Sequence, residues 1–246
     1  ISAFRIAWYK VHMPVYFYAS WFSTKATDFD IEVMIKGYDA IKNKMNRSTG
    51  LSELNSWRNS LKEMYITLND SNIPSDVGVA IEYNIPQTSK RVDFLISGYN
   101  KDNKGNVIIV ELKQWEKLQA VEGQDAIVET YTGGANRRVV HPSYQAWSYA
   151  ALIKDYNEYV QDAEIELHPC AYLHNYPRTE NDPLDAMQYE EILTDAPAFT
   201  YGQRELLRKF IKDNITNDAL SFLKIRASWG RNGNVNILNG YKYIPT

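Results

Sequence analysis

The sequence predicts a mixed α/β domain, and three observations support this fold class. An apolar face at helical spacing covers residues 52–68, and a second amphipathic helix is predicted over 142–157. Between them lie short apolar runs that are typical of strands, and these are VGVAIEYNI, RVDFLIS and VIIVELK. A further apolar run at 163–176 predicts a last strand. The predicted order is therefore helix, three strands, helix and strand, with a mixed sheet.

Local signals set the ends of these elements. Ser52 is a candidate N-cap of the first helix, and Pro86 ends the first strand because proline cannot donate to a sheet ladder. A polar turn containing glycine, at residues 98–106, joins the second and third strands into a predicted hairpin. A short ribbon is predicted around AIVETYTGGANRRVV, and two more helices are predicted over QYEEILTD and GQRELLRKFIKDNI.

A change of composition near residue 46 indicates the domain boundaries. The segment before it has helical spacing, with a second helix expected to start at Pro14. The predicted organisation is a helical segment at 1–46, a linker at 47–50, the α/β domain at 51–225, and a tail toward a missing downstream domain at 226–246.

Composition limits the classes of function. The net charge is -3, so a nucleic-acid site has to be a local patch on a mildly acidic chain. A single cysteine excludes an internal disulfide framework and fits a reducing, cytoplasmic setting. The longest apolar stretches are too short to span a bilayer, and no order typical of a signal peptide is visible, so no membrane partner is expected.

Three charged residues stand out at the strand ends. Glu111 and Lys113 share one face of their strand, and Asp93 lies on the preceding strand among apolar neighbours. Two adjacent buried carboxylates repel unless a cation joins them, and Mg²⁺ prefers oxygen ligands. Lys113 then lies beside the metal, where it can orient water and offset phosphate charge. The alternative is that Glu111 and Lys113 simply end an exposed strand.

These residues resemble a known family. Asp93 followed by VELK at 110–113, in this order of elements, resembles the PD-(D/E)xK nuclease superfamily and its restriction-endonuclease-like αβββαβ core. Gln145 and Tyr149 on the next helix are similar to the Q-x-x-x-Y motif of the RecB-like branch. The set further resembles the nuclease-like region that precedes Schlafen-like helicase ATPases in bacterial proteins. Val92 replaces the nominal proline of the family, and the chain contains no phosphate-binding loop of the ATPase.

The resemblance implies a function and a cofactor. It implies metal-dependent hydrolysis of DNA or RNA, with Mg²⁺ or Mn²⁺ bound by Asp93 and Glu111 and catalysis by these two with Lys113 and Gln145. Tyr149 would support the site, and a helicase or ATPase domain absent from this chain would be a partner. The alternative is a binding module with the same fold that holds nucleic acid or a partner without cleaving it. An interaction protein built around the first 46 residues is a second alternative.

Further acids and bases are candidates for supporting roles. Glu82 can add a carboxylate from the first strand, or it can be an exposed strand residue opposite a lysine. Glu53 and Glu63 on the preceding helix are alternatives, and Glu82 is preferred because its surroundings match the family better. For nucleic-acid binding the candidates are Arg91, Arg137 and Arg138, the last two predicted on a loop, where arginines are often merely solvated.

Residues 1–46 have a resemblance of their own. They are similar to a segment from the C-terminal part of the Gram-positive replicative DNA polymerase of the C family. The segment lacks the catalytic carboxylate cluster of a polymerase, so it is expected not to polymerise. A packing or docking module and a junction of two genes are both compatible with the sequence.

Overall fold

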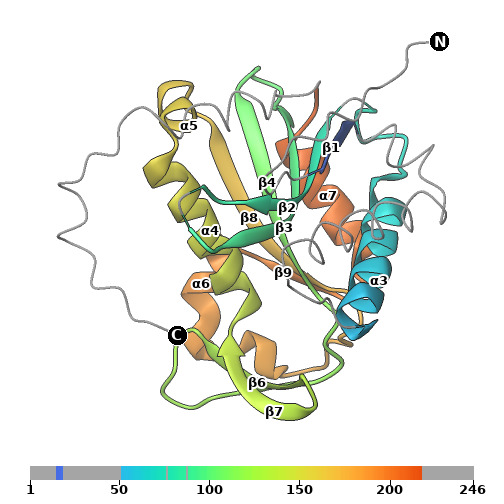
Figure 1. Ribbon diagram of the computed structural model, residues 1–246, viewed down its shortest axis with the longest axis vertical. Coiled ribbons are helices and arrows are strands. Elements are labelled where there is room, and N and C mark those ends of the chain that lie inside the picture. Colours follow the sequence, from blue (N-terminus) through green and yellow to red (C-terminus); the bar gives the residue numbers. More distant parts are fainter. Residues whose placement is uncertain (1–14, 19–50, 76, 87, 218–246) are drawn as a thin grey trace.

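A mixed β-sheet lies between two layers of helices in the computed structural model, which describes residues 15–18, 51–75, 77–86 and 88–217 (Figure 1). Its six strands are ordered β1–β2–β3–β4–β8–β9. They are β1 (Val15–Tyr18), β2 (Gly78–Asn84), β3 (Arg91–Tyr99), β4 (Gly105–Lys113), β8 (Glu166–Leu173) and β9 (Ala198–Thr200). The predicted mixed α/β class is therefore correct.

A second, three-stranded sheet and the helices complete the described part of the chain. The second sheet contains β5 (Leu118–Ala120), β6 (Ile127–Thr132) and β7 (Ala135–Val140). The α-helices are α3 (Leu51–Leu68), α4 (Pro142–Tyr156), α5 (Glu158–Asp162), α6 (Glu190–Asp195) and α7 (Arg204–Asn214). Two short 3₁₀ turns are η1 (Pro183–Asp185) and η2 (Met187–Tyr189).

The order of elements agrees with the prediction from Leu51 onward. Strands β3 and β4 form the expected antiparallel hairpin, in which Phe94 pairs with Val110. Strand β8 pairs with β4 in parallel, and a parallel pair needs a long crossover connection. The second sheet, α4 and α5 lie on this crossover.

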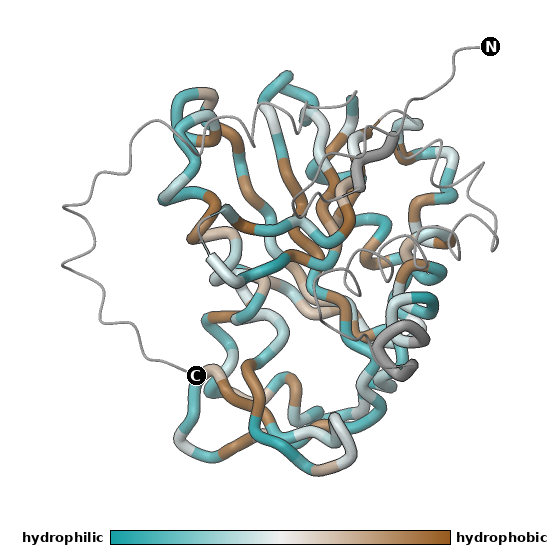
Figure 2. Tube along the Cα trace, viewed as in Figure 1, coloured by the Kyte–Doolittle hydropathy of each residue, from teal (hydrophilic) through white to brown (hydrophobic). Residues whose placement is uncertain are grey.

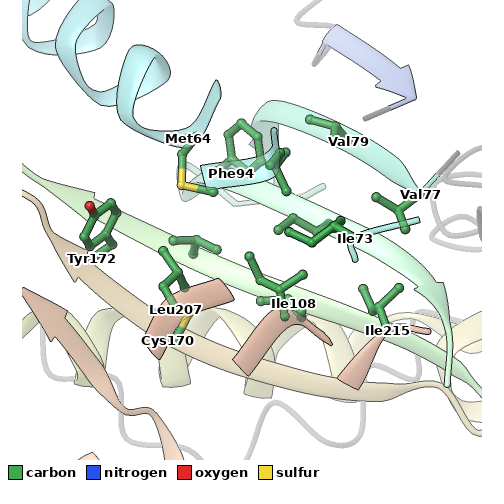
Figure 3. Close-up of a cluster of buried hydrophobic side chains, with 14 of the residues drawn as sticks. Met64, Ile73, Val77, Val79, Phe94, Ile108, Cys170, Tyr172, Leu207 and Ile215 are labelled. Atoms are coloured by element: carbon green, nitrogen blue, oxygen red, sulfur yellow. The ribbon is translucent and has the colours of Figure 1, made fainter. Parts of the chain in front are cut away.

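The helices α3 and α7 pack on one face of the main sheet (Figure 1). Alternate residues of β3 and β4, such as Phe94 and Ile108, meet Met64 of α3 and Leu207 of α7, and all four are fully buried. Figure 3 shows these side chains in one cluster. Figure 2 shows how the apolar residues gather along the sheet strands.

The helix α4 packs on the opposite face. Its Tyr149 and Ile153 lie in a cluster with Leu95 of β3 and Ile109 of β4. Because strand side chains alternate, the next residues of β4 on this side of the sheet are Glu111 and Lys113. The charged residues therefore continue an apolar row that faces α4.

Two predicted helices differ from the structure. The helix expected to start at Pro14 is wrong over Val15–Tyr18, which form β1 and pair with β2. The run VYFY contains β-branched and aromatic residues, which favour strands, and it pairs with the edge of β2, whereas a short isolated helix is only marginally stable. The helix predicted over 188–195 is shortened to α6, because residues up to Tyr189 form a 3₁₀ turn. The remainder of 1–46, the linker at 47–50 and the tail at 226–246 lie outside the described residues.

His141 joins the start of α4 to the rest of the molecule. Its Nδ1 accepts a hydrogen bond from the amide of Ser143 at 3.2 Å, and its Nε2 lies 3.3 Å from the carbonyl oxygen of Leu184. The ring packs against Tyr189 with 4.6 Å between centroids. The Tyr189 hydroxyl in turn donates to the carbonyl of Ile127 at 2.6 Å. Tyr189 therefore connects the start of β6 to His141 at the start of α4.

Replacing His141 by alanine should lower the free energy of unfolding by about 1–3 kcal/mol, because a buried cap and a ring contact are lost together. Burial lowers the pKa of His141 to about 4, against the opposing hydrogen bond to Leu184. The unfolded chain binds this proton near its ordinary pKa of about 6.5. The free energy of unfolding should therefore fall by up to about 3 kcal/mol as the pH decreases from 6.5 to 4.

Urea unfolding at about pH 7 and pH 4.5 measures both effects. The matched control is His168→Ala on β8, where the histidine is only partly buried. An alanine variant at His141 with unchanged stability and an unchanged pH profile would contradict this account of the histidine.

Candidate active site

Asp93, Glu111 and Lys113 form a charged cluster where β3 and β4 run side by side. Phe94 and Val110 are paired. The next residues toward the same end of the two antiparallel strands are Asp93, which precedes Phe94, and Glu111, which follows Val110. The Nζ of Lys113 donates to Oε1 of Glu111 at 2.6 Å. Asp93 Oδ2 accepts a hydrogen bond from the backbone amide of Leu112 at 2.9 Å. The structure thus brings together the two carboxylates and the lysine.

Burial makes this cluster electrostatically unusual. Glu111 is only 1% exposed, and no hydrogen-bond partner of its Oε2 is found among the described residues. Loss of water, and then the nearby charge of Asp93, raise the pKa of Glu111 to about 8 against the opposing effect of Lys113. Burial lowers the pKa of Lys113, but the carboxylates of Glu111 and Asp93 outweigh it, and the net change is upward.

Gln145 and Tyr149 approach the cluster from α4. They lie one helical turn apart, and Nε2 of Gln145 donates to the hydroxyl of Tyr149 at 2.9 Å. Burial raises the pKa of Tyr149, and the next largest cause is the charge of Glu111. Tyr149 packs with Leu95 and Ile109, so it lies over the same face of the sheet as Glu111.

Glu82 of β2 and Arg91 of β3 border the cluster on the side of Asp93 that faces away from β4. Glu82 lies across from Asp93 on β2, between the residue pairs that flank it in the ladder. It is buried, it forms an ion pair with Arg91, and its φ of 55° lies in the left-handed region. The guanidinium of Arg91 also lies 5.7 Å from the ring centre of Trp57. Glu82 therefore borders the site as a residue paired with Arg91.

The alternative acids from α3 do not join this cluster. Glu63 receives a hydrogen bond from Tyr172 at 3.2 Å and pairs with Arg204 at 2.6 Å. Because α3 and α7 cover the face opposite to α4, these contacts lie across the sheet from Glu111. The side chain of Glu53 lies outside the described residues.

Arg137 and Arg138 belong to β7, so the ribbon predicted around residues 126–140 is confirmed and the interpretation of the two arginines as loop residues is wrong. Arg137 Nη2 lies 3.5 Å from the carbonyl oxygen of Gly133, and Arg138 Nε lies 4.0 Å from Glu129 Oε2. These contacts are within the second sheet. A turn of only Gly133 and Gly134, both with positive φ, leaves the arginines in the returning strand.

The tryptophans near the site were not predicted to interact with its charges. Lys113 Nζ lies 5.5 Å from the ring centre of Trp115, an arrangement in which the ring attracts the cation. Trp115 also packs against the cluster that contains Leu118 and Val128 of the second sheet. Its position two residues after Lys113 is a signal for this contact, whereas nothing in the sequence indicates that Trp57 lies beside Arg91.

The donor set fits one kind of metal ion. Within the described ranges, no group of three or more His, Cys, Asp or Glu side chains is arranged to hold a metal. Mg²⁺ needs only one or two carboxylates, because it keeps several waters. Asp93 and Glu111 supply two carboxylates. Among the described residues Glu111 Oε2 has no hydrogen-bond partner, so a metal ion bound to this atom would break no hydrogen bond. The residues present therefore fit Mg²⁺ or Mn²⁺ better than a closed zinc site.

The fold and the site define a mixed α/β protein in which a buried glutamate, a partly buried aspartate and a lysine meet at one end of the central strands. No protein-family model matches the chain, and comparison with solved structures finds no significant match. Among the described helices, none is both long enough and apolar enough to cross a membrane.

Segments of the chain are similar to PolC-type DNA polymerase III. Identity to the enzyme of Streptococcus sanguinis is 34% over 98 residues, which is 40% of this chain and 7% of the relative. For Oceanobacillus iheyensis it is 47% over 49 residues, or 20% and 3% of the two chains. For Staphylococcus saprophyticus it is 50% over 46 residues, or 19% and 3%.

These matches confirm the predicted similarity to segments of this polymerase. The shorter matches are about as long as the predicted segment 1–46, and the match to the streptococcal enzyme is about twice that length. The chain spans less than a tenth of the length of these relatives. The resemblance to the nuclease superfamily stays a prediction.

Proposed function

We propose that the α/β domain is a metal-dependent nuclease that hydrolyses phosphodiester bonds, with a restriction-endonuclease-like core. The observation that carries the proposal is the cluster of Asp93, Glu111 and Lys113, in which two carboxylates, one of them fully buried, and a lysine meet at one end of paired strands. The similarity of segments to a DNA polymerase favours DNA over RNA as the substrate. A connection to a helicase or ATPase domain belongs to the proposal as well.

Each residue of the cluster has a role in this proposal. Asp93 and Glu111 would hold Mg²⁺ or Mn²⁺, which when bound supplies an activated water and offsets charge on the phosphate. Lys113 donates from Nζ, so it can orient that water and stabilise the negative charge that develops in the transition state. Gln145 acts from α4, held in place by its hydrogen bond to Tyr149. Arg91 is at the rim, where it can attract phosphate.

One observation favours the alternative of a binding module that does not cleave. Lys113 is already paired with Glu111, and the raised pKa of Glu111 favours its protonated form near neutral pH. A protonated carboxyl is a poor metal ligand. In this reading the cluster is a neutralised, structural feature of a fold that binds nucleic acid through other residues.

A cleavage assay separates the two functions. The full chain, incubated with plasmid DNA and with single-stranded oligonucleotides, should cut in Mg²⁺ or Mn²⁺ and should not cut in EDTA. Asp93→Asn should cleave at least about 100-fold more slowly, because one of two metal carboxylates becomes a neutral amide. Asp102→Asn is the matched control, since Asp102 is exposed in the turn between β3 and β4.

Two outcomes decide against parts of the proposal. Equal cleavage by the parent and by Asp93→Asn would show that the site has been assigned to the wrong residues. Binding of DNA by the parent without cleavage in any divalent metal would establish the binding module in its place.

A further inference from the structure

We propose that the β6–β7 hairpin (Ile127–Val140) is a contact surface for single-stranded DNA, on which Tyr131 stacks on a base and Arg138 binds a phosphate. The inference rests on the proposed function, because it names how a nuclease substrate would be held next to the site. Its evidence is separate, since it depends on the exposed face of the second sheet and not on the carboxylates.

An aromatic ring is exposed on this hairpin. Tyr131 is 66% exposed, although it lies on a strand between residues that pack inward. The alternation along β6 turns Val128 and Thr130 toward the protein and leaves Glu129 and Tyr131 on the outer face. An exposed, flat ring on a regular strand provides a platform on which any base can stack.

Positive charge lies next to the ring. Arg138 pairs with Glu129 across the ladder, which puts it on the same outer face and diagonal to Tyr131. Its side chain is 70% exposed, and its 4.0 Å contact with Glu129 is long for an ion pair. The hairpin contains two arginines and one glutamate, whereas the whole chain has a net charge of -3. Arg137 pairs with the inward-facing Thr130, so Arg138 is the arginine of the outer face, and its exposed guanidinium suits a phosphate.

The base of the hairpin is rigid, so the exposed face has a fixed position. Val128 is fully buried, and the hydroxyl of Thr130 donates to the carbonyl of Lys117 at 2.6 Å. The Tyr189 hydroxyl donates to the carbonyl of Ile127. At the other end, Gly133 and Gly134 form a tight two-residue turn of the kind that matches the twist of a hairpin.

The hairpin is also connected directly to the candidate site. It lies on the chain between β4, which carries Lys113, and α4, which carries Gln145. Trp115 packs into the cluster at the base of the second sheet and contacts the Lys113 ammonium group. Figure 1 shows the hairpin at one end of the molecule, beyond the sheet and α4. A strand held on this face would therefore run from the hairpin toward the cluster of carboxylates.

Fluorescence anisotropy with labelled oligo(dT) in EDTA tests the inference without cleavage. Tyr131→Ala should raise the Kd roughly 5- to 100-fold, the range for one base stacked on an aromatic ring, and Tyr131→Phe should bind like the parent. Arg138→Ala should weaken binding and reduce the slope of log K against log salt by about 0.7, the value for one lost phosphate contact on a single strand.

The matched control is Tyr201→Ala, because Tyr201 is also 66% exposed but follows β9. Equal binding by Tyr131→Ala and the parent, equal weakening by Tyr201→Ala, or no binding of oligo(dT) by the parent would each overturn the inference. Preference for oligo(U) with the same dependence on Tyr131 would also overturn it, in favour of RNA. Binding that depends on Tyr131 in a protein that never cleaves would support this inference and refute the nuclease proposal, so the two failures are distinguishable.

Discussion

Replacing Lys113 by methionine is expected to reduce DNA cleavage at least about 100-fold. Methionine keeps much of the length and the apolar stem of lysine, so the packing on Trp115 is largely retained. What is lost is the ammonium group 2.6 Å from Glu111, which in the proposed mechanism orients water and stabilises charge on the phosphate. Single-turnover cleavage of a labelled duplex, with substrate binding measured in parallel, gives the effect on the chemical step.

Lys104→Met is the control for this substitution. Lys104 lies in the turn before β4, and its 3.9 Å contact with Glu166 is exposed. The control should cleave within about two-fold of the parent, because exposed pairs of this kind contribute little. Cleavage by Lys113→Met at a rate close to that of the parent would remove Lys113 from the mechanism.

The metal-free protein should lose stability as the pH rises, and Glu111 should be the cause. The folded protein keeps Glu111 protonated up to about pH 8, whereas the unfolded chain releases this proton near pH 4.5. The folded state thus binds more protons in this range, and the free energy of unfolding decreases with rising pH. The difference of pKa corresponds to at most about 5 kcal/mol between these two pH values.

Urea titrations of the parent and of Glu111→Gln at about pH 5.5, 7 and 8.5 measure this effect. The glutamine variant cannot lose a proton at this position, so it should become progressively more stable than the parent as the pH rises. Mg²⁺ should restore stability to the parent at high pH, because it binds the ionised carboxylate. Parallel pH profiles of the two proteins would rule out Glu111 as the titrating group.

The sequence was most informative where contacts are local. The closeness of Asp93 to Glu111, one step beyond the pair Phe94–Val110, follows from a hairpin whose turn is visible at residues 98–106, and side-chain alternation then places Lys113 on the same face as Glu111. The one-turn spacing of Gln145 and Tyr149 predicts their shared helix face, and the structure adds the hydrogen bond between them. These features can be predicted from the side-chain period of a strand or a helix and from the position of one turn.

Contacts between distant segments were not predictable in the same way. Strand β1 forms because an open edge of β2 is available, and the helical spacing of its own segment gives no hint of that edge. The position of Arg138 depended on the exact length of a glycine turn. The ion pair of Glu82 with Arg91 joins two strands, and Glu82 has a positive φ. This backbone conformation is uncommon for glutamate, so the sequence does not indicate it.

The two halves of the candidate site differ in mechanical stiffness, and this follows from the place of β4 in the sheet. Glu111 lies on an interior strand that is hydrogen-bonded to β3 on one side and pairs with Ala171 of β8 on the other. The backbone that carries Glu111 is therefore held by ladders on both sides. Gln145 and Tyr149 are held by packing of a helix, which yields more easily than a ladder. We expect that α4 moves when the site adjusts to the width of a bound substrate. The backbone that carries Asp93, Glu111 and Lys113 should keep its position.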